Sequence, residues 1–175
     1  MSRRVCAALL AAALLGAAPR PASFAPGGVD ATFALLAHQA DDAEIEMARL
    51  ALRRSDADEA RMFAQNMIDE HGKLERQLDG LARAPAGAPR TNDIDRLAML
   101  RLGALPAADF DQQYLMQQVG DHLAAISVYS SEAEQGHDLR LREFAARTVP
   151  MLRAHLQQAV DAVRHVGGSS PFKQH

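Results

Sequence analysis

Four residues that can bind metal ions lie in the middle of four separate apolar stripes: Glu44, His71, His122 and His155. Within each stripe apolar side chains recur every three or four residues, which predicts an amphipathic helix that turns the metal-competent group toward the core. One carboxylate and three imidazoles form a suitable ligand set for Zn, Cu, Ni or Fe. We therefore predict that these four residues bind a single transition-metal ion.

Two acidic residues directly precede predicted ligands: Glu70 comes before His71 and Asp121 before His122. Neighbouring residues on a helix point about 100° apart, so these carboxylates cannot easily reach the metal of the adjacent imidazole. We expect them to serve as hydrogen-bond partners for imidazoles on other helices, as acidic residues commonly do around metal centres.

The same four residues admit two other interpretations. A buried Glu/His network without metal would make the protein a structural or interaction module. A mononuclear metal with an open coordination position would make it a redox enzyme. The sequence contains no Gly-x-Ser-x-Gly elbow and no phosphate-binding glycine loop, so no catalytic residues are predicted.

Four long helices must position the predicted ligands, and periodicity places them at residues 30–54, 56–83, 106–135 and 138–166. Each ligand lies within about three residues of its helix midpoint, which is about 4.5 Å along the helix axis. The four side chains can therefore meet at one level. The residues expected to cap the helices are Asp30, Ser55 or Asp56, Thr91 and Asp138.

The connector between the second and third long helices begins with Pro85, Gly87 and Pro89, which end the second helix. A short helix is then predicted from Thr91 to Leu102, with Ile94, Leu97 and Ala98 on one side. The predicted fold is all-α, a four-helix bundle of two hairpins joined by this connector. Periodicity leaves open whether the connector folds back or runs the length of the bundle, as in ferritin-like proteins.

The N-terminus predicts export. Arg3 and Arg4 precede an apolar run, Val5–Leu15, that is too short to span a bilayer, so residues 1–22 are predicted to be a signal peptide with an open cleavage site. Residues 23–29 and 167–175 are predicted to be a flexible leader and tail around a domain at 30–166. The mature chain is predicted to be periplasmic or secreted, without a membrane span.

The charge and the cysteine content of the chain limit the partners and ligands that it can bind. The chain has a net charge of −3, and removal of the signal, which contains Arg3, Arg4 and Arg20, makes the mature chain more acidic. No basic face is evident, so nucleic-acid binding is disfavoured. The sequence leaves a homodimer open and identifies no protein partner. The only cysteine, Cys6, lies in the predicted signal, so the mature chain has neither disulfides nor thiolate ligands.

Longer motifs surround the predicted ligands: Phe63-Ala64-x-x-Met67-Ile68-Asp69-Glu70-His71, Asp109-Phe110-Asp111-x-x-Tyr114, Gly120-Asp121-His122 and Pro150-x-Leu152-x-x-His155-Leu156. Together they resemble the bacterial domain-of-unknown-function family 4142, over about residues 30–163. Members of that family are exported proteins with a ferritin-like four-helix fold and no settled activity. The resemblance therefore implies the crossover topology and an exported location, without supplying a reaction.

The chain differs from true ferritins in the residues that precede its histidines. The residues three before the histidines are Ile68, Val119 and Leu152, so the predicted core contains no Glu-x-x-His pair. Because di-iron bundles use such pairs to bind their metals, ferroxidase and di-iron oxygenase chemistry are disfavoured.

Overall fold

Apolar residues spaced by three and four produce helices throughout residues 28–168, the part of the chain that the computed structural model describes. The helices are α1 (Val29–Arg54), α2 (Asp58–Leu81), α3 (Asp93–Ala104), α4 (Ala107–Gln135) and α5 (Leu139–Gly168). No strand occurs in this range, and the predicted all-α class is confirmed. None of the described helices is long and apolar enough to cross a membrane.

The predicted N-terminal segments are only partly covered by the structure. The predicted signal peptide, residues 1–22, lies outside the described residues, as does most of the predicted leader. Helix α1 already begins at Val29 and α5 continues to Gly168, so the two helices extend slightly beyond the predicted limits of 30 and 166. Differences of one or two residues are usual at helix ends, where fraying and capping overlap.

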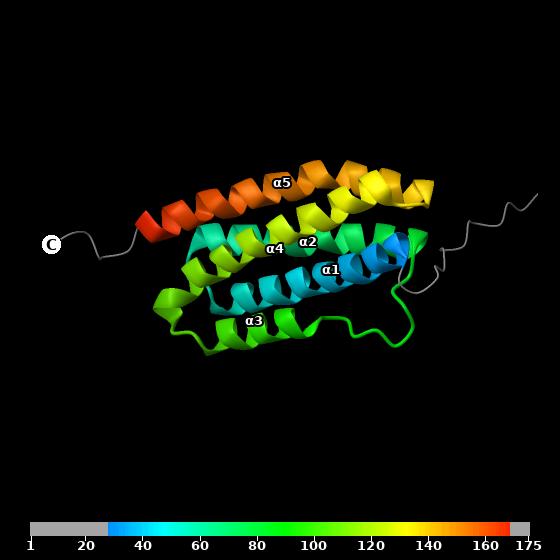
Figure 1. Ribbon diagram of the computed structural model, residues 1–175. Helices are drawn as coiled ribbons and strands as arrows, with labels where there is room; N and C mark the ends of the chain where they lie inside the picture. Colours follow the sequence, from blue (N-terminus) through cyan, green and yellow to red (C-terminus); the bar gives the residue numbers. More distant parts are fainter. Residues whose placement is uncertain (1–27, 169–175) are drawn as a thin grey trace, which may run out of the picture.

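The four long helices pack side by side, with α1 against α2 and α4, and α5 against α2 and α4 (Figure 1). Their facing sides form two apolar clusters. One contains Met47, Phe63, Met67, Leu102, Phe110, Tyr114 and Leu115. The other contains Phe33, Leu74, Leu78, Tyr129, Leu141, Phe144 and Leu152. Along α2, α4 and α5, the predicted histidine ligands fall between the residues of the two clusters.

The connector runs the length of the molecule, which decides the question that periodicity leaves open (Figure 1). At the end of α2, the Nε2 of His38 on α1 donates to the Ala82 carbonyl at 2.9 Å. Helix α4 begins at the opposite end, where the backbone N–H of Ala57 donates to Asp111 Oδ2 at 3.3 Å. Helices α2 and α4 therefore run in the same direction.

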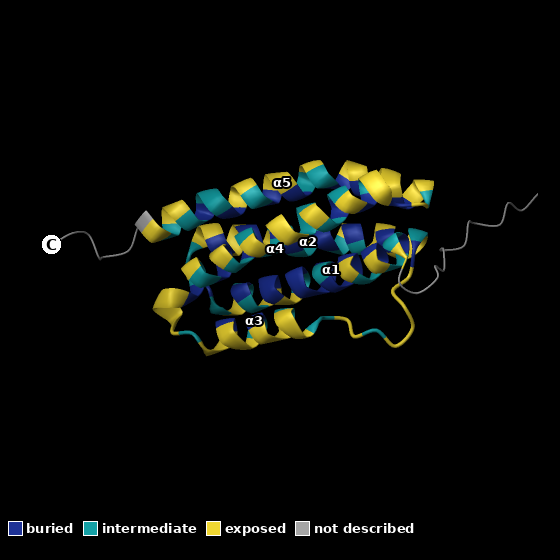
Figure 2. Cartoon of the chain, in the orientation of Figure 1, coloured by how far each residue is buried: buried dark blue, intermediate teal, exposed yellow. Residues whose placement is uncertain are grey.

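Helix α3 lies on the outside of the long helices and is mostly exposed (Figure 2). Its buried residues are Ala98 and Leu102, one turn apart, which face α1 and α4. Of the three residues predicted to share one side of this helix, Ala98 is buried, whereas Ile94 and Leu97 are 79% and 68% exposed. Apolar residues occur all round this short helix, so its pattern is too weak to fix its rotation.

Two of the helix caps differ from the predictions. Asp30 does not cap α1, whose N-cap position is Gly28. Its Oδ1 instead accepts the backbone N–H groups of His137 at 2.7 Å and Asp138 at 3.2 Å, which fixes the start of α1 to the turn between α4 and α5. Helix α3 is capped by Asn92, whose Oδ1 accepts from the backbone N–H groups of residues 94 and 95, and not by its neighbour Thr91.

Of the other two capping predictions, one is confirmed and one is wrong. Asp138 caps α5 as expected, because its Oδ1 accepts the backbone N–H of Arg140 at 2.8 Å. Neither Ser55 nor Asp56 caps α2, whose N-cap position is Ala57, a residue that makes no side-chain capping hydrogen bond. The Ser55 hydroxyl donates to the Ala57 carbonyl instead, at 3.2 Å.

Glu132, near the end of α4, should make stability depend on pH. The residue is fully buried, and burial, reinforced by the neighbouring Asp30 carboxyl, raises its pKa to about 7. An unfolded glutamate titrates near pH 4.3, so the stability that the protonated group confers is complete below about that pH and is lost as the pH rises through about 7. Glu132→Gln, which imitates the protonated carboxyl, is expected to raise the free energy of unfolding at pH 8 by about 1–3 kcal/mol.

Urea unfolding at pH 4 and pH 8 tests this expectation. The gain should appear at pH 8 and be absent at pH 4. The exposed neighbour Glu134, changed to Gln in the same way, should leave stability unchanged at both values. An equal gain for Glu132→Gln at both pH values would show that packing, and not ionisation, is responsible.

Candidate metal centre

Three imidazoles from three helices meet in the interior. His71 lies on α2, His122 on α4 and His155 on α5, and each side chain is at most 2% exposed. The centroids of the three rings are 5.4–5.6 Å apart. One nitrogen from each ring can be chosen so that all three lie within 4.8 Å of one another. The structure therefore brings together three of the four predicted ligands.

Each ring is held by one hydrogen-bond acceptor. Nδ1 of His71 lies 2.8 Å from Asp41 Oδ1, and Nε2 of His155 lies 2.7 Å from Glu70 Oε2. For His122 the acceptor is the carbonyl of Gln118 on the preceding turn, 2.9 Å from Nδ1. A nitrogen that faces such an acceptor carries the hydrogen, which leaves the lone pair on the other ring nitrogen.

The other nitrogen of each ring is buried and has no hydrogen-bond partner among residues 28–168. These atoms are Nε2 of His71, Nε2 of His122 and Nδ1 of His155. Burying a polar atom without a partner costs free energy, normally about 1–3 kcal/mol. Three such atoms, on rings whose centroids are 5.4–5.6 Å apart, are therefore expensive unless they bind something that accepts lone pairs, and a metal ion does so.

Burial also sets the protonation state of the rings. It lowers the pKa of His71 to about 4 and that of His122 to about 3, with the neighbouring imidazole His71 adding to the latter shift. Burial likewise lowers the pKa of His155, although the hydrogen bond to Glu70 opposes the change. At neutral pH the three rings are thus neutral imidazoles, the form that coordinates metals.

Glu44, the fourth predicted ligand, lies outside this group. Its Oε1 is 3.9 Å from Nδ1 of His122, the nitrogen that faces the Gln118 carbonyl. Glu44 therefore lies nearest the ring nitrogen that already faces a carbonyl, and not the unpartnered Nε2. Helix α1 instead contributes Asp41, one turn before Glu44, as the partner of His71.

The acidic residues around the three imidazoles were predicted only in part. The expectation that Glu70 pairs with an imidazole of another helix is confirmed by its hydrogen bond to His155. Asp121, for which the same was expected, accepts a hydrogen bond from Gln117 of its own helix at 2.9 Å. Asp41 was missed, although it precedes Glu44 by three residues and so shares its face of α1. That spacing was the available signal.

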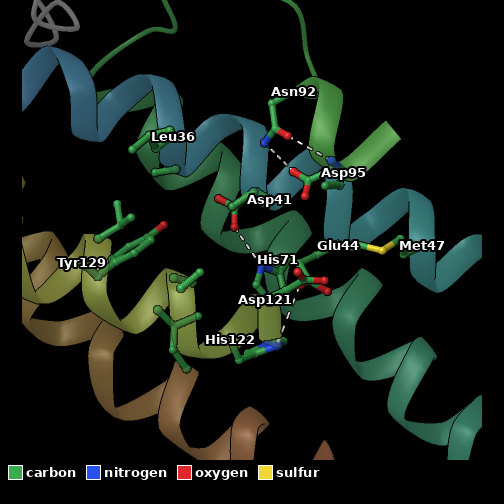
Figure 3. A pocket seen from close by; sticks show the side chains of 17 residues that line it. Leu36, Asp41, Glu44, Met47, His71, Asn92, Asp95, Asp121, His122 and Tyr129 are labelled. Atoms are coloured by element: carbon green, nitrogen blue, oxygen red, sulfur yellow. Dashed lines mark hydrogen bonds and ion pairs between the residues drawn. The ribbon is translucent and has the colours of Figure 1, made fainter. Parts of the chain in front are cut away.

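A cavity of about 140 Å³ lies beside His71 and His122, between α1, α4 and the start of α3 (Figure 3). Its polar lining includes four carboxyl groups, and neither Lys nor Arg is among its lining residues. The acids are Asp41, Glu44, Asp95 and Asp121. Burial raises the pKa of Asp41 and of Glu44 well above the usual range, and raises that of Asp121 to about 6.

A second cluster of potential ligands, His38, Glu75 and Asp79, serves as a comparison. Here both ring nitrogens are occupied, because Nδ1 of His38 contacts Glu75 Oε1 at 2.9 Å and Nε2 donates to the Ala82 carbonyl. Burial alone would lower the pKa of His38, but these hydrogen bonds raise it overall. An imidazole whose two nitrogens both face oxygen acceptors joins α1 to the end of α2 and offers no free nitrogen to a metal.

The comparisons with known proteins agree with the helical class. The family model described as "Domain of unknown function (DUF4142)" matches residues 16–162. A DUF305 protein of Streptomyces coelicolor, described as a candidate secreted protein, is 17% identical with a TM-score of 0.68, covering 86% of this chain and all of that one. A DUF305 fragment from Deinococcus radiodurans has the same identity and TM-score over 84% and 99% of the two chains. At this identity the likeness shows the fold alone. No curated protein matches the chain.

Proposed function

The chain belongs to the domain of unknown function family DUF4142, and we propose that it binds one transition-metal ion through His71, His122 and His155. Its role would be metal handling or protection against metal stress in the cell envelope. We further propose that the four long helices form a ferritin-like bundle with a centre of its own kind, in which three neutral imidazoles replace the carboxylate-rich di-iron ligands.

The observation that supports the proposal is the pairing pattern of the six ring nitrogens. Three contact an oxygen acceptor, and three are buried without a partner among the described residues. A metal-free Glu/His network should instead use both nitrogens of each ring, as His38 does. Orientation of each imidazole by a carboxylate or carbonyl on its far nitrogen is the usual arrangement around metals.

Three imidazoles at 2.0–2.1 Å from a tetrahedral ion would have nitrogens about 3.4 Å apart. The observed limit of 4.8 Å therefore leaves only a small movement of each ring before an ion is bound. Zn, Cu, Ni and Fe all accept imidazole nitrogen, and the fourth position would be free for water or another ligand. When bound, the ion would supply Lewis acidity or redox capacity, while the protein would orient the three rings.

Export is part of the proposal. The apolar run behind Arg3 and Arg4 supports a signal peptide, although it lies outside the described residues. A cell envelope location would place the centre where metal supply is less controlled than inside the cell. The similar Streptomyces protein, described as a candidate secreted protein, is consistent with that setting.

Elemental analysis of the untagged mature chain, purified from its native compartment, tests the proposal. We expect about one equivalent of Zn, Cu, Ni or Fe per chain after desalting. Adding the same ion to metal-free protein at a hundred times its dissociation constant should raise the free energy of unfolding by about 2.7 kcal/mol. Protein that contains no metal and whose melting temperature is unchanged by all four ions would sink the proposal in favour of a structural network.

A further inference from the structure

Two hollows approach the histidine centre from opposite sides. One is the cavity between α1, α3 and α4 that is lined by His71 and His122. The other is a cleft of about 320 Å³ between α2 and α5, lined by Glu70, the partner of His155. The two hollows offer an ion different surroundings, because the side chains that line them differ in charge.

The α2/α5 cleft is unfavourable for a cation. Its lining contains Lys73 and Arg147, with Glu70 as the one acidic residue. Glu70 is moreover occupied by its hydrogen bond to His155. A divalent ion that approached from this side would meet two positive charges before a single carboxylate that already has a partner.

The α1/α3/α4 cavity has the opposite character. Asp95 and Asp121 are half-buried, Glu44 and Asp41 are buried, and no basic side chain lines the space. Carboxyl oxygens are the ligands that an incoming cation can use, and no Lys or Arg among the lining residues repels it. The cavity thus favours a cation over an anion, and it extends to two of the three imidazoles.

Unpartnered atoms in this cavity indicate where an ion could bind on its way inward. Glu44 is only 4% exposed, yet its Oε2 has no hydrogen-bond partner among residues 28–168. The hydroxyl of Tyr129, which is 1% exposed and also lines the cavity, is unpartnered in the same range. Figure 3 shows the labelled side chains of Glu44, Asp121 and His122 around the same part of the cavity.

We propose that the α1/α3/α4 cavity is the path by which a divalent cation reaches the histidine centre, with Glu44 as the transfer ligand at its inner end. This proposal rests on the proposed metal binding by His71, His122 and His155. It gives Glu44 a role that its position beside His122 allows: the carboxylate binds the ion transiently near the ring and releases it to the three nitrogens. Asp95 and Asp121 attract the ion at the outer end.

The rate of Co²⁺ uptake by the metal-free protein tests the path, since visible absorption of Co²⁺ reports its binding by the imidazoles. Glu44→Gln is expected to slow uptake at least about tenfold while the final amount bound stays at one equivalent. Ala124→Phe, at an exposed position of the cavity lining, should slow uptake by steric blockage without touching a carboxyl group. The exposed Ala146→Phe, which is outside both hollows, is the matched control and should load at the wild-type rate.

The outcomes separate the two proposals. A wild-type protein that binds no ion overturns both of them. If Glu44→Gln and Ala124→Phe load as fast as wild type while one equivalent still binds, the path is wrong and the centre stands. Loss of the final equivalent in Glu44→Gln, with the protein folded, would make Glu44 a permanent ligand and overturn its role in transfer. Faster loading in Arg147→Ala, without an effect of Ala124→Phe, would assign the path to the α2/α5 cleft.

Discussion

His122→Ala is expected to abolish stoichiometric metal binding while the helices remain folded. His122 is the most deeply buried of the three imidazoles, and its removal leaves two nitrogens, which cannot complete the three-imidazole set. Loss of a residue that merely orients a ligand costs 10- to 100-fold in affinity, so loss of the ligand itself should exceed roughly 100-fold. Elemental analysis after desalting should find almost no metal, and circular dichroism should retain the helical signal.

The matched control for this variant is His137→Ala, which removes an exposed imidazole from the turn between α4 and α5. It should retain one equivalent of metal. His71→Ala and His155→Ala should behave like His122→Ala, because each contributes one unpartnered nitrogen to the same space. Full metal content in all three core variants would refute the centre, whatever their stability.

Asp41→Ala is expected to have the second largest effect, a loss of metal affinity approaching 100-fold. Asp41 contacts Nδ1 of His71 at 2.8 Å, and both side chains are 2% exposed, so removal of the carboxyl leaves a buried N–H without its acceptor. The His71 ring would lose both its orientation and the acceptor for its N–H. Asp41→Asn keeps an oxygen acceptor without the charge and should lose only about tenfold. Competition against a chelator of known affinity measures both variants.

Glu70 provides the internal comparison for Asp41. It holds His155 in the same way at 2.7 Å, but its side chain is 37% exposed. Water can therefore take the place of the carboxylate after Glu70→Ala, and the loss of affinity should be clearly smaller than for Asp41→Ala. If the two variants lost affinity equally, burial would not be what makes the Asp41 contact important.

Much of this fold follows from periodicity, while the details of the centre depend on helix rotation. His71, His122 and His155 occupy apolar stripes near the midpoints of their helices, which was enough to predict that they meet. The stripe on α1 is broad, however, and both Asp41 and Glu44 face the interior. Periodicity cannot tell which of two inward carboxyls, one turn apart, contacts a given ring, nor which ring nitrogen it contacts. Those choices depend on side-chain rotamers and on the rotation of α1 by a fraction of a turn.

The capping errors have a related cause. Asp30 has the right residue type and position to cap α1, but its carboxylate finds backbone N–H groups in the α4–α5 turn, more than a hundred residues away in sequence. Local sequence preferences describe what a side chain can do for its own helix. They do not describe a contact that forms only after α1 has packed against the turn between α4 and α5.

The crossover connector divides the chain into two hairpins, and the three imidazoles are divided unequally between them. His71 belongs to the first hairpin, α1 and α2, whereas His122 and His155 belong to the second, α4 and α5. A bound ion would therefore add a link between two halves that are otherwise joined by packing, by a few hydrogen bonds such as that of Ala57 to Asp111, and by the connector. If the chain were cut near Gly87, the two fragments would form a split protein whose reassembly depends on the metal concentration. The same architecture that buries the centre would then serve as a molecular switch for detecting the ion.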